Sequence, residues 1–170
     1  MKKIAYLCTS PKDLEDETTI EIIKTHPYEA DIIDITYQLN RYNDDQLKNY
    51  IVQLVDEYFD IYLFDNVPTS RFESVMTPGM ICLKKEASIC PLIQVAALLH
   101  HRLTRFEMLV ASYATDGITG LREAGATKVE IDYIVLRNKL AHSALPMETI
   151  TGIRARAEVE KDYFDEGCYF

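Results

Sequence analysis

The first half of the chain alternates short apolar runs with stretches in which apolar residues recur at helical spacing. The runs predict four strands, at residues 4–8, 31–36, 59–64 and 80–83. Because helical stretches separate the first three strands, this order favours parallel pairing with right-handed crossovers. We therefore expect an α/β fold with a small parallel, Rossmann-like sheet over residues 1–83.

Two helices are expected between these strands. Ser10 suits the N-cap of the first helix, Pro11 suits its first helical position, and the pair His26-Pro27 ends it. Asn43 begins the second helix, and Gln46 stands three residues later as in a capping box.

The pattern of the second half, residues 84–170, is helical. Apolar residues predict one long helix over 92–114, and the stretch 115–125, which holds three glycines, breaks it. We expect this helical half and residues 1–83 to pack as one compact unit.

A later helix carries the candidate chemistry. Thr127 and Glu130 form a capping box that begins it, and Arg137, Asn138 and His142 stand near its end. Five residues turn about 140° around a helix, so Arg137 and His142 do not share one stripe. The long arginine side chain can still reach the region of the imidazole. The simpler alternative is that Arg137 and Lys139 are solvated and that His142 only ends the helix, where the helix dipole favours positive charge.

The segment Arg137-Asn138-Lys139-Leu140-Ala141-His142 resembles the R-N-x-x-x-H form of the motif in HEPN domains, which are helical domains frequent in toxin–antitoxin, CRISPR and abortive-infection systems. The resemblance covers less than half of the chain. It implies a HEPN-like helical C-terminal half and a metal-independent endoribonuclease of a defence or toxin system, with RNA as substrate and no cofactor. It also implies a homodimer in which two motifs form one composite site.

The residue types suit that chemistry. RNA cleavage without a metal needs a proton taken from the 2′-hydroxyl and one given to the leaving oxygen, and an imidazole can do either. By the resemblance, His142 is the acid or base, Arg137 stabilises the charge that develops on the phosphate, and Asn138 orients the histidine or a phosphate oxygen.

Composition limits the other classes of function. Acidic side chains number 27 against 18 basic ones, and the net charge of −9 argues against a protein that coats nucleic acid through a broad basic surface. No two of the four cysteines have C-x-x-C spacing, so we expect no zinc site. We find no signal peptide and no apolar window long enough to cross a membrane, and we therefore expect a cytoplasmic protein.

The turn after the first predicted strand is a second candidate site. Thr9, Ser10 and Lys12 stand at the carboxyl end of that strand, where doubly wound sheets bind ligands and helix N-termini accept phosphates. No G-x-G-x-x-G or Walker motif is present, and a capped helix start without any ligand is the alternative. An α/β region before a HEPN-like region also resembles the architecture of CRISPR-associated nucleases activated by cyclic oligoadenylates, which implies a nucleotide ligand.

A non-catalytic protein is the second hypothesis. It would sense a nucleotide through its first half, or inhibit a protein partner through its acidic surface, and its HEPN-like domain would be inactive. His100 and His101 are adjacent and point about 100° apart on a helix, so they do not form a simple metal pair. Arg102 and Arg105 either add to a phosphate-binding patch or are solvated.

Overall fold

We describe the protein from a computed structural model, which describes residues 3–7, 13–25, 31–64, 80–83 and 89–142. The chain divides into two compact units. The first contains residues 1–10 and 19–101, and the second contains residues 11–18 and 102–170.

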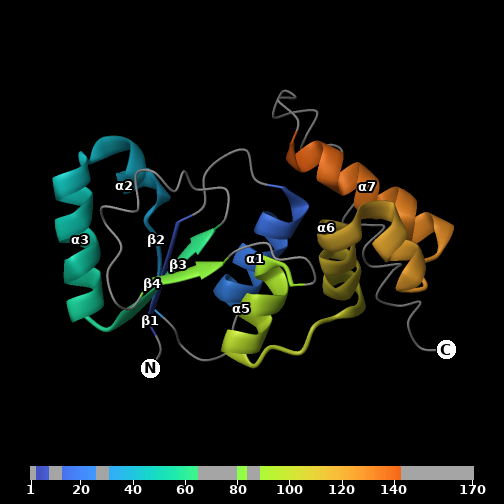
Figure 1. The fold of residues 1–170 in the computed structure, drawn as a ribbon, viewed down its shortest axis with the longest axis horizontal. Helices are drawn as coiled ribbons and strands as arrows, with labels where there is room; N and C mark the ends of the chain where they lie inside the picture. The colour runs from blue at the N-terminus through green and yellow to red at the C-terminus, as the bar shows by residue number, and fades with distance from the viewer. Residues whose placement is uncertain (1–2, 8–12, 26–30, 65–79, 84–88, 143–170) are drawn as a thin grey trace. The chain divides into compact units, whose positions relative to one another are not determined.

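The first unit is built on a parallel sheet. Its four strands lie in the order β2-β1-β3-β4, and all neighbours are parallel (Figure 1). The strands are β1 (Lys3–Leu7), β2 (Asp31–Asp34), β3 (Phe59–Phe64) and β4 (Met80–Leu83). The expected α/β fold, with a parallel sheet in the first half and helices in the second, is confirmed.

Helices cover both faces of this sheet. On one face, α3 (Asp44–Asp56) presents a stripe of apolar residues at helical spacing. The buried core on that side comprises Ala5, Leu7, Ile35, Leu47, Ile51, Leu54, Phe59, Ile61 and Leu63. The opposite side holds α5 (Pro91–Leu99) and residues 19–25 of α1 (Leu14–Thr25) (Figure 1). Because both faces are covered, β1 and β3 are apolar runs rather than alternating strands.

Side chain–backbone hydrogen bonds decide where several elements begin and end. The Asn43 side chain accepts from the Gln46 N–H at 2.9 Å, and Gln46 Oε1 accepts from the Asn43 N–H at 3.1 Å. The capping box predicted for α3 is therefore confirmed. In contrast, β2 ends two residues before the expected position, because Asp34 Oδ1 accepts from the Thr36 N–H at 2.9 Å and turns the chain. Thr36 thus begins α2 (Thr36–Arg41), a helix that the pattern did not predict.

The predicted start of α1 was wrong. The helix begins at Leu14, after Asp13, and Ser10 and Pro11 lie outside the described residues. Asp13 Oδ1 accepts from the Asp16 N–H at 2.8 Å, and Asp16 Oδ2 accepts from the Asp13 N–H at 3.4 Å. Two aspartates therefore satisfy backbone groups at this helix start.

The long helix expected over 92–114 was also wrong. His100 adopts a left-handed conformation with φ of 53°, which ends α5 at Leu99. The next helix, α6 (Arg105–Glu123), begins with a capping box in which Thr104 Oγ1 accepts from the Glu107 N–H at 3.3 Å and Glu107 Oε2 accepts from the Thr104 N–H at 2.6 Å. The sequence Thr104-Arg-Phe-Glu107 carries this signal and could have revealed the break.

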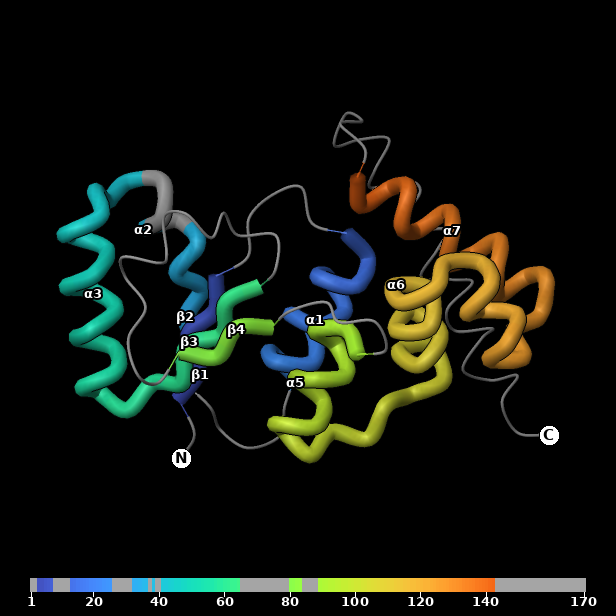
Figure 2. The backbone as a smooth tube through the Cα atoms, viewed as in Figure 1, coloured from blue at the N-terminus to red at the C-terminus, as the bar shows by residue number. Residues whose placement is uncertain are grey.

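The break predicted for the glycine-containing stretch falls at Gly117, where two helical segments within α6 meet at a kink. Gly117 has φ of 61° and ψ of −141°, and the backbone changes direction within α6 (Figure 2). A Cβ at position 120 would collide with the backbone oxygen of Ser112, so only glycine fits this close approach.

The last described helix, α7 (Lys128–Ala141), packs on α6. Its predicted capping box between Thr127 and Glu130 is confirmed. The rings of Phe106 and Tyr133 meet edge to face, with centroids 6.0 Å apart. No helix in the described ranges is long and apolar enough to cross a membrane.

A partly buried ion pair joins the starts of α6 and α7. Arg105 Nε donates to Glu130 Oε1 at 2.8 Å, and Arg105 Nη2 donates to Glu130 Oε2 at 3.1 Å and to the Gly125 carbonyl at 3.1 Å. Burial acts to raise the pKa of Glu130, but hydrogen bonds from Arg105 and Thr127 outweigh burial and lower it. Arg105 is therefore part of the fold and not a solvated cation or a free phosphate ligand.

Candidate functional site

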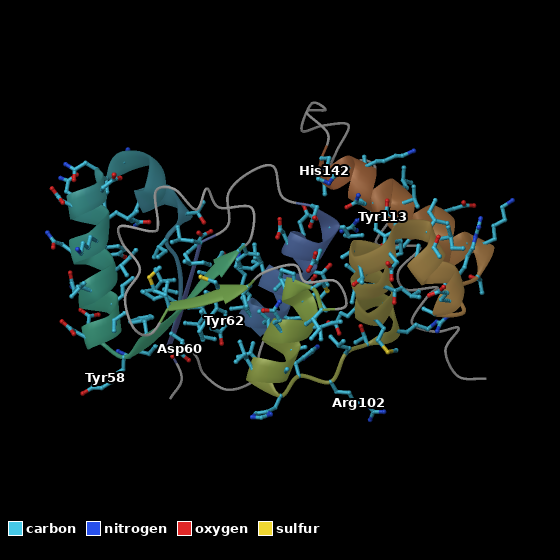
Figure 3. The ribbon with its side chains drawn as sticks, viewed as in Figure 1. Tyr58, Asp60, Tyr62, Arg102, Tyr113 and His142 are labelled. Atoms are coloured by element: carbon cyan, nitrogen blue, oxygen red, sulfur yellow. The ribbon has the colours of Figure 1, made fainter. Side chains whose placement is uncertain are left out.

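The motif predicted from the sequence lies on the last turns of α7, in the second unit. His142 is the C-cap of the helix, and its N–H donates to the Asn138 carbonyl at 3.2 Å. Its side chain is exposed at the end of α7 (Figure 3). The imidazole is therefore open to a ligand from solvent.

The Arg137 side chain is less exposed than that of His142 and lies near a carboxylate. Its side chain is 19% exposed, and Nη2 lies 4.0 Å from Oε2 of Glu17 in the first turns of α1. A charge-assisted N–H···O bond is usually about 2.7–2.9 Å long, so attraction between the charges holds this pair without a close hydrogen bond. The pattern of the sequence did not single out Glu17 as a partner for the motif.

Asn138 contacts the same turn of α1. Its Oδ1 accepts from the Leu14 N–H at 3.2 Å. Leu14 is the first residue of α1, where backbone N–H groups have no partner within the helix. Asn138 thus supplies part of the helix cap from a position far along the sequence.

The three motif residues do not all meet. Arg137 and Asn138 both contact α1, whereas His142 lies at the solvent end of α7, roughly 7.5 Å further along the helix axis than Arg137. Asn138 and His142 are four residues apart and so are neighbours on the helix surface. The amide oxygen of Asn138 accepts from the Leu14 N–H, so the NH₂ group is the part of this side chain that could donate to a ligand.

The second candidate site lies outside the described residues. The site consists of Thr9, Ser10 and Lys12, and their ligand-binding role stays a prediction. The sheet order is relevant to it, because the strand order reverses between β1 and β3, and such switch points bind ligands at the carboxyl ends of strands. In the sequence, all three residues fall in the segment 8–12, which follows β1.

The other candidate cations, His100 and Arg102, are exposed and lie outside helices. His100 is exposed beyond the end of α5 and is not within a helix, and Arg102 is exposed (Figure 3). In the part of the chain that the structure describes, no group of three or more His, Cys, Asp or Glu side chains is placed to hold a metal ion.

The Tyr62 hydroxyl is a buried polar group outside the motif. Tyr62 is fully buried in β3, and its hydroxyl has no hydrogen-bond partner among the described residues. Burial, with a smaller contribution from the charge of Asp60, raises the pKa of Tyr62 to about 12. Nothing in an apolar run such as Phe59–Phe64 indicates beforehand that a hydroxyl will lack a partner.

No family model, no curated protein and no solved structure matches this chain.

Proposed function

We propose that the protein is a metal-independent endoribonuclease of HEPN type, which acts in the cytoplasm in a defence or toxin system. The observation that supports this proposal is the placement of Arg137, Asn138 and His142 on the last turns of one capped helix, with the imidazole exposed at its end. RNA is the substrate, and a homodimer that joins two such helix ends forms the complete site.

The proposed reaction needs one base and one acid. A base takes the proton of the 2′-hydroxyl, the 2′-oxygen attacks phosphorus, and the bond from phosphorus to the 5′-oxygen breaks as an acid protonates that oxygen. The products carry a 2′,3′-cyclic phosphate and a 5′-hydroxyl. His142 serves as one of the two groups and its copy in the second protomer as the other. Arg137 stabilises the negative charge that develops on the phosphate.

The second candidate function is a non-catalytic binding protein that senses a nucleotide through Thr9, Ser10 and Lys12 or inhibits a protein partner. The contacts of Arg137 with Glu17 and of Asn138 with Leu14 favour it, since they give two motif residues a role in packing. Under this alternative the end of α7 has no catalytic role.

The two functions differ in a cleavage assay. A mixed RNA pool is incubated in EDTA with the intact chain, with Arg137→Ala, with His142→Ala, and with Arg122→Ala as the control. Arg122 is an exposed arginine in the last turn of α6 and is not part of the motif. The endoribonuclease proposal predicts cleavage by the intact chain and the control and a loss of about 100-fold or more in His142→Ala. His142→Ala should keep its melting temperature because the side chain is exposed. Unchanged cleavage in His142→Ala, or none by the intact chain, would favour the binding protein.

A further inference from the structure

The first turns of α1 place a carboxylate beside the arginine of the motif. From this contact we infer that Glu17 is an internal competitor for the anion that Arg137 binds, and that a nucleic-acid phosphate must displace this carboxylate to reach the guanidinium. The inference deepens the proposed function, on which the choice of RNA phosphate as the anion rests.

The geometry suits a pair that opens. The Nη2 and Oε2 atoms lie 4.0 Å apart, and the side chains of Arg137 and Glu17 are 19% and 29% exposed. Pairs of this kind, loose and reached by water, contribute little to stability. Loss of this ion pair alone should therefore change the free energy of unfolding little, and the Glu17 carboxylate lies beside the guanidinium that a phosphate would bind.

Asn138 keeps this carboxylate in place. The Leu14 N–H donates to Asn138 Oδ1 at 3.2 Å, which anchors the start of α1 to α7, and Glu17 lies three residues further along the helix. A negative side chain in the first turn is also favoured by the dipole of α1. Asn138 thus acts as a positioning residue: it sets the distance between Glu17 and Arg137 rather than touching substrate through its oxygen.

The size of the effect follows from the charges. For a phosphate taken to lie about 5 Å from the carboxylate, Glu17→Gln removes one repulsive charge, which at an effective dielectric constant of about 50 to 80 changes binding roughly fourfold to tenfold. Affinity for a polyanion should rise by this factor in Glu17→Gln. This gain in affinity should require the Arg137 side chain, because the Glu17 carboxylate competes with the polyanion for the Arg137 guanidinium.

A binding assay tests this without any cleavage. The probe is a short fluorescent single-stranded DNA, which lacks the 2′-hydroxyl and cannot react, and its affinity is measured by anisotropy at fixed ionic strength. The proteins are the full chain, Glu17→Gln, Glu17→Asp, Arg137→Ala and the double variant. Glu21→Gln is the matched control, since Glu21 is an exposed carboxylate on the same helix.

The expected result has three parts. Glu17→Gln binds the DNA roughly fourfold to tenfold more tightly, Glu17→Asp and Glu21→Gln stay within about twofold of the full chain, and Glu17→Gln adds nothing once Arg137 is alanine. An equal gain in Glu21→Gln, a gain that persists without Arg137, or no gain in a Glu17→Gln protein with unchanged melting temperature would overturn the inference.

The inference and the proposed function fail in different ways. If Glu17→Gln tightens DNA binding through Arg137 but no variant cleaves RNA, Glu17 is a competitor at a binding site and the nuclease proposal is lost. If cleavage depends on His142 while Glu17→Gln leaves affinity unchanged, the nuclease stands and the competitor role is lost.

Discussion

Replacing Tyr62 by Phe should stabilise the first unit or leave it unchanged, although the substitution removes a polar group from a native protein. The hydroxyl lies in a fully buried side chain and has no hydrogen-bond partner among the described residues. Its desolvation is not compensated in the folded state, and leaving such a group unpaired costs about 1–3 kcal/mol. Phenylalanine keeps the ring and removes that penalty, so we expect a gain of up to about 2 kcal/mol.

The same residue should control stability at alkaline pH. Tyr62 has a pKa of about 12 in the folded protein against an ordinary value of 10.0. Below pH 10 the hydroxyl is protonated in both states, and its contribution does not change with pH. Between about pH 10 and 12 the unfolded chain releases this proton while the folded one keeps it, so stability falls by about 1.4 kcal/mol per pH unit. Tyr62→Phe should lack this part of the alkaline loss.

Tyr6→Phe is the matched control. Tyr6 and Tyr62 are register partners on β1 and β3 and are both fully buried, but the Tyr6 hydroxyl donates to Asp34 Oδ2 at 3.0 Å. Removing that hydroxyl should destabilise by about 1.5–3 kcal/mol, because the bond is to a charged group. Urea unfolding followed by far-UV circular dichroism at neutral and alkaline pH compares the three proteins. A loss of more than about 1 kcal/mol in Tyr62→Phe would refute the reasoning, since it would mean that the hydroxyl has a partner.

Two further changes test the local structure. Tyr58 is 87% exposed and has a left-handed φ of 68° just after α3, so Tyr58→Gly should stabilise by about 1 kcal/mol in urea unfolding, whereas Tyr58→Ala should give no gain. Glu130→Gln should destabilise by roughly 1 kcal/mol, because the Arg105 guanidinium loses its charged partner but is 34% exposed, so water screens the pair. The lowered pKa of Glu130 means that its ion pair stabilises the protein above the ordinary value of 4.5 and that this contribution is lost as pH falls through the folded value. The acid-induced loss of stability should therefore be smaller in Glu130→Gln, and an unchanged acid profile would contradict the role given to this pair.

Much of the fold could be predicted because its signals are local. The apolar runs located β3 and β4, and the capping boxes at Asn43 and Thr127 located the starts of α3 and α7. Each cap joins groups three residues apart, so the residues that make it are visible together in the sequence. The errors were also local in origin. The capping box at Thr104 was overlooked. Hydrogen bonds to the side chains of Asp13 and Asp34 place the start of α1 and the end of β2 at other residues than predicted.

For the candidate site, the sequence supplied Arg137, Asn138 and His142 through a resemblance and the start of α7 through a cap. The sequence did not indicate which groups these side chains contact. Only the tertiary structure decided that Asn138 accepts from the Leu14 N–H and that Glu17 lies beside Arg137. It also decided that the buried Tyr62 hydroxyl has no partner among the described residues. Residues 14 and 138 are far apart in the chain, and no short pattern relates them. Such contacts depend on how whole helices pack, whereas caps and strands depend on a few neighbouring residues.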